Sequence, residues 1–234
     1  MSSLARIVEA PERAALFLDV DGTLAPIVER PEDATVPEGT RAELRRLTEK
    51  YALVACITGR PGSVAAAIVG VEGIVYAGEH GLELDPAAEE WVERLREFVA
   101  GAGWRAENKR LSAAFHYREH PRPEQAEREL RLVEAAAQAA GLRTRWGRMV
   151  LEVLPPIDAT KGTAVRRLLE ERGLTRALFA GDDTTDLDAF RALDGLDVAV
   201  RVAVVSAEGP GELGAAADVV VSGTDELLDL LRRL

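Results

Sequence analysis

Short apolar segments alternate with helical segments through both ends of the chain, and this alternation restricts the fold more than any other feature. Each apolar segment ends in glycine or polar residues, which indicates a strand buried on both faces. The predicted strands are Ala14–Val20, Ala52–Ile57, Gly73–Ala77, Arg176–Ala180, Asp197–Val200 and Asp218–Val221. The predicted helices between them are Pro37–Lys50, Pro61–Val69, Thr160–Arg172, Thr184–Leu193 and Thr224–Leu231. Strands and helices in this order predict right-handed crossovers and a parallel sheet, and therefore an α/β fold.

The middle of the chain, from about Leu82 to Leu154, breaks this alternation. The segments Ser112–Arg118 and Arg148–Leu154 are partly polar and alternate in part, which is typical of antiparallel strands with one exposed face. Two long helices are also expected, Pro86–Ala100 and Pro123–Ala140. We therefore predict a core made of residues 1–82 and 156–234, with an α+β insert at residues 83–155.

The 234-residue chain is acidic, since 29 basic and 40 acidic side chains give a formal net charge of −11. Such a surface repels nucleic-acid phosphates and anionic lipids, so we expect neither nucleic-acid nor membrane binding. The single cysteine, Cys56, lies in an apolar segment and is expected to be a small buried side chain without a disulfide. Residues 1–11 lack an apolar signal segment, and no stretch approaches about 18 apolar residues. These features predict a cytoplasmic protein.

The strongest chemical signal is the sequence Asp19-Val20-Asp21-Gly22-Thr23-Leu24 at the end of the first predicted strand. In an open parallel sheet, ligands bind beyond the carboxyl ends of the strands. The two-residue spacing directs both carboxylates to one side while the chain stays extended. Such a pair can bind a divalent cation, or can divide nucleophilic attack and proton transfer between its members. The alternative is an acidic turn that an aspartate caps.

Three further strand or helix ends carry side chains suited to ion binding. Thr58 follows the second strand and opens a helix whose N-terminus can bind an anion; alternatively, it only caps that helix. Lys161 opens another helix, where its charge opposes the helix dipole, so it indicates either a bound anion or a solvated lysine. Gly181–Asp186 has three acids within five residues, and their repulsion favours a bound cation over a simple acidic helix cap.

These four groups, in this order along the chain, resemble the haloacid dehalogenase superfamily of aspartyl phosphotransferases. The resemblance implies a Rossmann-like parallel-sheet core with an inserted α+β cap. It also implies that Asp19 attacks phosphorus and becomes an aspartyl phosphate. Asp21 would protonate the leaving sugar oxygen and then activate water, while Thr58 and Lys161 would hold phosphoryl oxygens.

The same resemblance implies a Mg²⁺ site beside the nucleophile. Its ligands would be Asp19, the backbone carbonyl of Asp21, and Asp182. Asp183 and Asp186 would lie in an outer shell or orient the lysine. Because a phosphate monoester dianion repels a carboxylate nucleophile, Mg²⁺ and the lysine would offset that repulsion.

The insert and its joints resemble the trehalose-6-phosphate phosphatase family in particular. The matching segments are Tyr76–Glu83, Glu107–Lys109, Ser112, His116–Arg118, Leu151–Val153 and Gly181–Asp186. The resemblance implies that the insert is a cap over the active-site crevice and carries the sugar specificity. Charged side chains make strong hydrogen bonds to sugar hydroxyls. The implied substrate-binding residues are Gly22, Arg60, His80, Glu107, Lys109, Arg118 and Glu152, with Arg60 and His80 at the junction of core and cap.

Other interpretations of these positions stay open. Alternatively, Glu107 and Lys109 form an exposed cross-strand pair that stabilises the sheet weakly. His116 lies on a predicted strand and is expected to be structural. The sequence departs from the family at Leu187, where an acid is usual, and at Thr58, where serine is common but the hydroxyl is kept.

The resemblance implies a Mg²⁺-dependent phosphatase that hydrolyses trehalose 6-phosphate to trehalose and phosphate in trehalose biosynthesis. The nearest alternative is a capped phosphatase for another sugar phosphate, such as sucrose, glucosylglycerol or mannosylglycerate phosphate. A non-catalytic phosphatase-like module is less favoured, because such a domain should lose the nucleophile or the lysine, and both are present. A functional link to a trehalose-6-phosphate synthase would fit this role, and a monomer is favoured.

Overall fold

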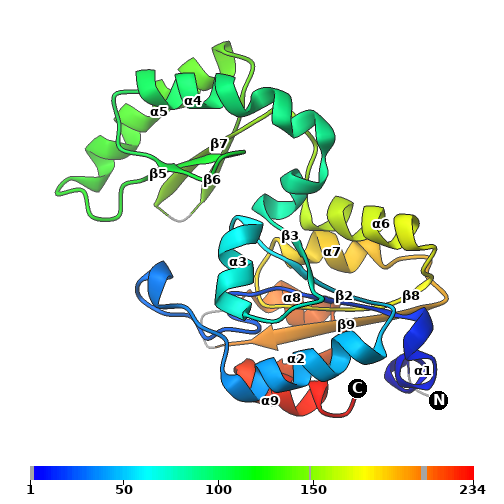
Figure 1. Cartoon of the computed structure of the whole chain (residues 1–234). Helices are drawn as coiled ribbons and strands as arrows, with labels where there is room; N and C mark the ends of the chain where they lie inside the picture. Colours follow the sequence, from blue (N-terminus) through cyan, green and yellow to red (C-terminus); the bar gives the residue numbers. More distant parts are fainter. Residues whose placement is uncertain (1–2, 148, 207–209) are drawn as a thin grey trace. The chain divides into compact units, whose positions relative to one another are not determined.

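The computed structural model describes residues 3–147, 149–206 and 210–234. The chain divides into two compact units, coloured along the sequence in Figure 1. The core unit comprises the residues up to Gly81 and those from Ala159 onward, and the insert unit is Leu82–Asp158. Among the described residues, no helix has both the length and the apolar character that crossing a membrane requires.

A parallel sheet forms the centre of the core unit, with the strand order β10-β9-β8-β1-β2-β3. The strands are β1 (Ala15–Leu18), β2 (Leu53–Ile57), β3 (Val75–Ala77), β8 (Arg176–Gly181), β9 (Val198–Val205) and β10 (Val219–Ser222). In the middle of the sheet, Leu18 pairs with both Ala180 and Cys56. The strands β8, β1 and β2 therefore end at nearly the same level, and the residues that follow them lie at one edge of the sheet.

Helices cover both faces of this sheet, which explains why its strands are almost continuously apolar. The helices are α1 (Ser3–Glu9), α2 (Glu38–Lys50), α3 (Gly62–Val69), α6 (Lys161–Arg172), α7 (Asp186–Ala192), α8 (Gly211–Ala216) and α9 (Gly223–Leu231). On the face covered by α2 and α9, Leu16 and Leu18 pack with Leu44 and Leu230. On the face covered by α6 and α7, Phe179 packs edge-on against the ring of Phe190 of α7, 6.0 Å between centroids.

The insert unit has an antiparallel sheet, ordered β4-β5-β7-β6, with two long helices on one face. Its elements are α4 (Val92–Gly101), β4 (Glu107–Asn108), β5 (Ala113–His116), α5 (Pro123–Ala139), β6 (Arg143–Gly147) and β7 (Val150–Leu154). Phe115, Leu151 and Val153 point from the sheet into a core that they share with Leu130 and Val133 of α5. The opposite face of the sheet carries polar and charged side chains.

The predicted fold class, a parallel-sheet core with an inserted α+β region, is confirmed, and several element boundaries differ. The predicted helix from Pro86 is a 3-10 segment, Pro86–Trp91, that continues into α4. Strand β9 extends to Val205, because Val202–Val204 are also buried. The polar strand β6 and the short helices α1 and α8 were not predicted. Position 148, the start of a predicted strand, lies outside the described residues, and β7 begins at Val150.

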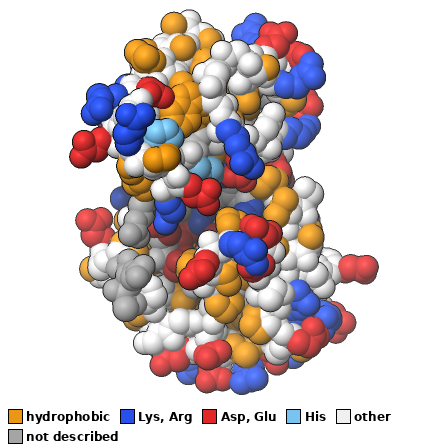
Figure 2. Space-filling view, turned by 90° about the vertical axis from the view of Figure 1, so that its left-hand side faces the viewer, with side chains coloured by type: hydrophobic (Ala, Val, Ile, Leu, Met, Phe, Trp, Pro, Cys, Tyr) orange, Lys and Arg blue, Asp and Glu red, His pale blue; other side chains and the backbone are white. Residues whose placement is uncertain are grey.

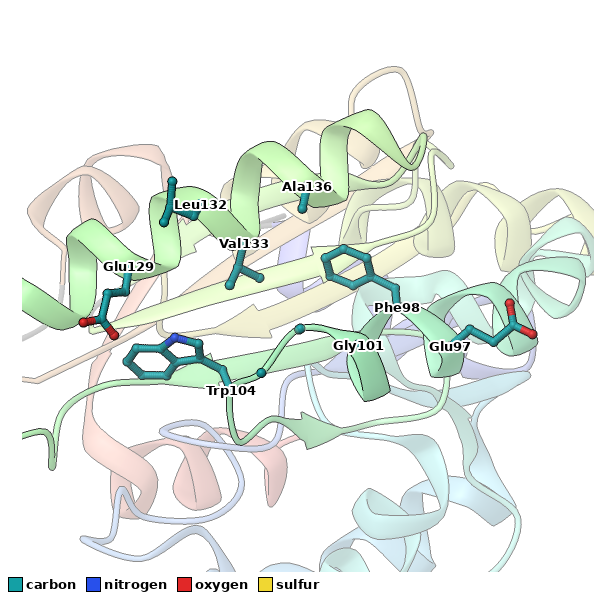
Figure 3. A pocket seen from close by; sticks show the side chains of 10 residues that line it. Glu97, Phe98, Gly101, Trp104, Glu129, Leu132, Val133 and Ala136 are labelled. Carbon is teal, nitrogen blue, oxygen red and sulfur yellow. The ribbon is translucent and has the colours of Figure 1, made fainter.

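Two further features are the charged surface of the molecule and a cavity in the insert unit. Figure 2 shows a face of the molecule on which Lys and Arg side chains are interspersed with Asp and Glu. A cavity of about 640 Å³ lies between α4 and α5 of the insert unit, where Phe98, Trp104 and Val133 contribute apolar walls (Figure 3). None of the residues lining this cavity is a predicted site residue, and the cavity adjoins the helices instead of the polar face of the sheet.

Candidate active site

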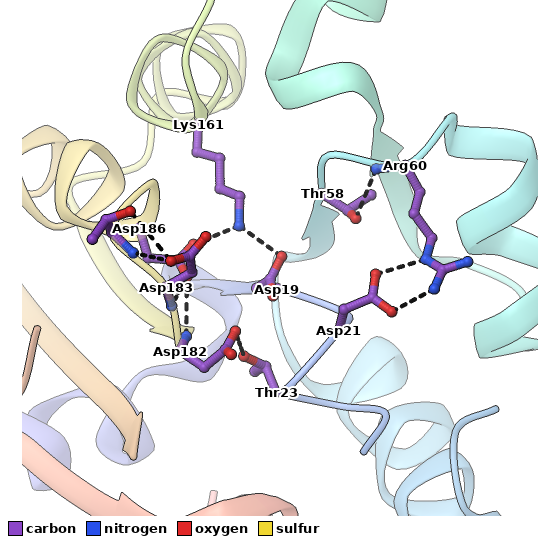
Figure 4. Close-up of polar contacts among 10 residues, drawn as sticks. Asp19, Asp21, Thr23, Thr58, Arg60, Lys161, Asp182, Asp183 and Asp186 are labelled. Carbon is purple, nitrogen blue, oxygen red and sulfur yellow. Dashed lines mark hydrogen bonds and ion pairs between the residues drawn. The ribbon is translucent and has the colours of Figure 1, made fainter. Parts of the chain in front are cut away.

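A buried ion-pair cluster lies at the carboxyl ends of the central strands of the core unit (Figure 4). Asp19 directly follows β1, and its backbone N–H donates to the carbonyl oxygen of Ala180 at 2.9 Å. The ammonium Nζ of Lys161 lies 2.7 Å from Asp19 Oδ1 and 2.7 Å from Asp186 Oδ1. All three side chains are buried. Asp19 and Lys161, 142 residues apart in the sequence, thus contact each other directly.

Local sequence explains why Lys161 reaches this position. It is the first residue of α6, and the preceding Thr160 caps the helix by accepting a hydrogen bond from the backbone N–H of Thr163. A side chain at Gly162 would bring a Cβ within 2.4 Å of the carbonyl oxygen of Asp188 in α7. Glycine therefore allows α6 and α7 to approach closely, which brings the lysine beside Asp186.

Asp186 fixes the loop that follows β8. Its Oδ2 accepts the backbone N–H groups of Asp182 and Asp183, at 3.0 and 2.9 Å, while its Oδ1 accepts from the lysine. A Cβ at Gly181 would lie 2.3 Å from the carboxyl carbon of Asp186, so only glycine fits there. Asp183 turns its own carboxylate to the backbone N–H of Thr184 at 2.6 Å. Asp186 thus shapes the loop and holds Lys161.

Three carboxylates of this cluster suit a divalent cation. Oxygen atoms of Asp19, Asp182 and Asp186 lie within 4.8 Å of one another, and carboxylate oxygens are the ligands that Mg²⁺ prefers. The free oxygens of Asp19 and Asp182 fit a metal better than Asp186, whose two oxygens already accept three hydrogen bonds.

The electrostatics of the cluster show an excess of negative charge. Burial raises the pKa of Asp19 well above its ordinary value, against the attraction of Lys161, and the nearby Asp186 and Asp182 raise it further. Burial, followed by repulsion from Asp186, raises the pKa of Asp182 to about 6. Burial alone would lower the pKa of Lys161, but the two contacting carboxylates outweigh it and keep the pKa above its ordinary value. One ammonium therefore faces three carboxylates, an excess that a divalent cation would balance.

The loop Asp21–Thr23 approaches Asp182 closely. Gly22 has a φ of +80°, and a Cβ there would lie only 2.0 Å from Asp182 Oδ2. The hydroxyl of Thr23 lies 3.4 Å from Asp182 Oδ1. Gly22, which the sequence predicts to contact substrate, makes room for the Asp182 carboxylate in the core unit. Thr23 was not singled out, although the acid–glycine–threonine order of the motif places it next to the predicted acids.

Asp21 forms a two-pronged ion pair with Arg60. The guanidinium Nε lies 2.6 Å from Asp21 Oδ2, and Nη2 lies 2.7 Å from Oδ1. The Nη1 of the same arginine donates to the carbonyl oxygen of Pro31 at 2.9 Å. Arg60, predicted to line the core–cap junction, is thus engaged with the second aspartate of the motif in this structure.

Thr58 is buried at the end of β2, and the turn after β3 is bonded to its loop. His80 donates its backbone N–H to the carbonyl oxygen of Thr58 at 2.8 Å, and Glu79 donates to that of Arg60 at 2.9 Å. Both Glu79 and His80 have positive φ values, 49° and 57°. A Cβ at Gly59 would lie 2.7 Å from the His80 ring, so glycine here lets the ring lie over the Thr58 loop. A positive φ at two successive non-glycine residues costs energy and is typical of functional turns.

Four of the predicted substrate-binding residues lie in the insert unit, and three of these share the polar face or edge of its sheet. Glu107 is exposed on β4, and its Oε2 lies 3.0 Å from His116 Nε2. Glu152, on β7, lies 3.7 Å from Lys109 Nζ. The fourth residue, Arg118, is exposed on the turn after β5. His116, expected to be structural, is exposed beside Glu107, because Phe115 faces the core and the next residue of a strand faces the other way.

Sequence comparison matches most of the chain to one family. The profile of the trehalose-phosphatase family matches residues 17–102 and 96–222. A trehalose-phosphate phosphatase from Mycobacterium marinum is 36% identical over 212 residues, which cover 81% of this chain and 54% of that protein. The chain therefore spans about half the length of this relative.

Solved structures share the same architecture. The crystal structure of a trehalose-6-phosphate phosphatase related protein is 26% identical and has a TM-score of 0.73, covering 94% of this chain and 96% of that one. A haloacid dehalogenase-like hydrolase from Bacteroides thetaiotaomicron, 18% identical with a TM-score of 0.67, covers 94% of this chain and 98% of its own and has the same fold. Since the family profile runs from Phe17 in β1 through the insert unit and Asp182 to the end of β10, the chain belongs to the trehalose-phosphatase family.

Proposed function

We propose that this protein hydrolyses trehalose 6-phosphate to trehalose and inorganic phosphate through a phosphorylated aspartate. The observation that carries this proposal is the buried contact between Asp19 and Lys161 at the edge of the parallel sheet. A carboxylate held by an ammonium at the carboxyl end of a central strand is suited to attack phosphorus, because the ammonium also attracts the phosphoryl group. Membership of the trehalose-phosphatase family supports the choice of substrate.

In the first step a carboxylate oxygen of Asp19 bonds to phosphorus, and the bond between phosphorus and the sugar oxygen breaks. Lys161, already in contact with the nucleophile, would stabilise the charge on the phosphoryl oxygens. Thr58, buried at the end of β2, would donate its hydroxyl to the same group. In the second step a water oxygen bonds to phosphorus, the aspartyl bond breaks, and the carboxylate of Asp19 is restored.

Asp21 would transfer the protons in both steps. It would give a proton to the departing sugar oxygen and then take one from the attacking water. Both of its oxygens accept one hydrogen bond from Arg60 in this structure, and each keeps a second lone pair through which a proton can pass. Arg60 would hold the carboxylate near the site between turnovers.

A divalent cation, with Mg²⁺ as the specific proposal, would be held by Asp19 and Asp182 together with the backbone carbonyl of Asp21. When bound, it would neutralise the negative charge of the substrate and the carboxylates. The excess of carboxylates over ammonium groups in the buried cluster supports this assignment. Asp186 would serve the site by holding Lys161 and the backbone of the Asp182 loop, and Asp183 by shaping that loop.

We further propose that the insert unit is a cap that recognises the sugar. Glu107, Lys109, Arg118 and Glu152 are polar residues on or next to the sheet face opposite its helices, and charged groups make strong hydrogen bonds to hydroxyls. His80 would contribute from the turn that follows β3.

A substrate panel tests the proposed function. Initial rates with Mg²⁺ should give the highest kcat/KM for trehalose 6-phosphate, well above sucrose 6-phosphate, glucosylglycerol phosphate and mannosylglycerate phosphate. A chelator should abolish phosphate release, and added Mg²⁺ should restore it, whereas Asp182→Asn should need much more Mg²⁺. Equal turnover of another sugar phosphate would refute the substrate assignment, and full activity with chelator would refute the metal.

A further inference from the structure

The polar face of the insert sheet has a charged row that crosses all four strands. Glu107 pairs with Ala114, Ala114 with Glu152, and Glu152 with Arg145. Residues paired directly across strands point to the same face of a sheet. The row therefore consists of an acid, a small residue, an acid and an arginine, on the side of the sheet that α4 and α5 do not cover.

Arg145 holds the carboxylate of Glu152 from one side, and Lys109 approaches it from the other. The Nε of Arg145 lies 2.8 Å from Glu152 Oε2, and Nη2 bonds to the same oxygen at 2.5 Å. Lys109 Nζ lies 3.7 Å from Oε1. The carboxylate is thus fixed by cations from two neighbouring segments, and its side chain keeps only 17% of its exposure. Within the described residues, Nη1 of Arg145 has no hydrogen-bond partner.

We propose that Arg145 is a positioning residue for sugar recognition, which acts by fixing the carboxylate of Glu152 toward the ligand. This inference rests on the proposed function and extends it to a residue outside the predicted site.

The charges on this face indicate what kind of group binds there. The two carboxylates of the row, Glu107 and Glu152, are balanced by two cations, Arg145 in the row and Lys109 beside it, so the row together with Lys109 is close to neutral. A neutral row does not attract a phosphate dianion, but it presents both donors and acceptors, which suits a neutral polyhydroxyl ring. The small side chain of Ala114 between the two acids leaves room at the centre of the row.

A purely structural role of Arg145 can be distinguished from a positioning role by the effects of its loss on folding and on substrate binding. The Arg145 side chain is itself 41% exposed, and Lys109 remains beside Glu152 when the arginine is lost, so its loss should leave folding nearly unchanged. If the arginine positions Glu152, its loss should weaken binding of the sugar phosphate and leave the chemistry at Asp19 intact. A small aryl phosphate, which offers no sugar hydroxyls, should be unaffected.

The experiment compares Arg145→Ala, Arg145→Lys and Arg96→Ala in the full chain with Mg²⁺. Arg96 is the matched control, because it is an exposed arginine of the same unit, paired with Glu93 on α4, away from the sheet. Steady-state kinetics are measured with trehalose 6-phosphate and with p-nitrophenyl phosphate. We expect Arg145→Ala to raise KM for the sugar phosphate about tenfold with kcat within about twofold, since a hydrogen bond to a charged group has this size. Its kcat/KM for the aryl phosphate, and both parameters of Arg96→Ala, should match the parent.

A double-mutant cycle with Glu152→Gln tests whether Arg145 changes KM through Glu152. If Arg145 acts through Glu152, the double variant should raise KM no more than about twofold beyond Glu152→Gln alone, and Arg145→Lys should recover part of the affinity. An unchanged KM in Arg145→Ala, an equal loss with the aryl phosphate, or fully additive effects would each overturn the inference. If the parent rejects trehalose 6-phosphate, the proposed function fails, and Arg145 is then judged on the sugar phosphate that the parent turns over best.

Discussion

The buried cluster of the core unit and the charged row of the insert unit are both built from ion pairs, but in opposite ways. In the core unit, Lys161 contacts two carboxylates at 2.7 Å and all three side chains are buried. In the insert unit, Glu107 and His116 are more than half exposed, and Arg145, which holds the less exposed Glu152, is 41% exposed. Buried charges attract each other strongly because little water screens them. Exposed charges are screened by water and exchange their partners readily. The first arrangement suits chemistry on phosphorus, and the second suits binding and release of a sugar.

The largest effect expected from this contrast is the loss of the nucleophile. Asp19→Asn should lower kcat by at least about 10⁴-fold, and by the same factor for trehalose 6-phosphate and p-nitrophenyl phosphate, because both need the covalent step. Phosphate release under saturating substrate measures it. Thermal unfolding is the control, and the variant should be no less stable than the parent, since the substitution removes one of three mutually repelling carboxylates. Comparable turnover by parent and variant would mean that the core cluster is not the reaction centre.

Removal of the lysine should damage both chemistry and stability. Lys161→Ala should lower the single-turnover rate of Asp19 phosphorylation by about 10²- to 10³-fold, because the ammonium no longer stabilises the phosphoryl charge. It should also lower the free energy of unfolding by about 3 kcal/mol, since buried carboxylates lose their partner. Quench-flow phosphorylation and urea unfolding measure the two effects. A variant that keeps the parent's phosphorylation rate would assign the lysine a structural role alone.

The same contrast explains what could be predicted from the sequence. Asp19, Thr58, Lys161 and Asp182 each follow a strand or open a helix, and a parallel sheet brings such positions to one edge whatever their separation in the chain. The apolar segments alone therefore placed these residues in one neighbourhood. The fold class followed from the same alternation, while the boundaries shifted by a few residues where burial continued past a polar residue, as at Arg201 in β9.

The partners of individual charged side chains could not be predicted in this way. The ion pair of Arg60 with Asp21 joins residues 39 apart, and nothing in either motif distinguishes it from a contact with substrate. Strand β6 was missed because its polar sequence lacks an apolar segment, and Arg145 was missed with it. The exposure of His116 could have been predicted, since a period of two along β5 places it opposite the buried Phe115.

A smaller effect is expected in the charged row. Glu152→Gln should raise KM for the sugar phosphate about tenfold, because the row loses a charged acceptor, and kcat should stay within about twofold of the parent. With p-nitrophenyl phosphate both parameters should be unchanged. If kcat falls for both substrates instead, the row contributes to the chemical step, and the separation between recognition in the insert unit and catalysis in the core unit does not hold.

The smallest effects are expected from removing a single hydrogen-bonding group, and one such variant in each unit is compared. Thr160→Ala removes the cap of α6 and should lower the free energy of unfolding by about 1 kcal/mol, whereas Gln125→Ala, which removes a 2.8 Å bond to Glu129 on α5, should lower it by about 0.3 kcal/mol. Urea unfolding measures both. Because Thr160 immediately precedes Lys161, its loss should also reduce kcat several-fold, while Gln125→Ala leaves the kinetics unchanged. Equal kinetics in the two variants would show that the lysine is held by Asp19 and Asp186 alone, and that the helix start contributes nothing to its position.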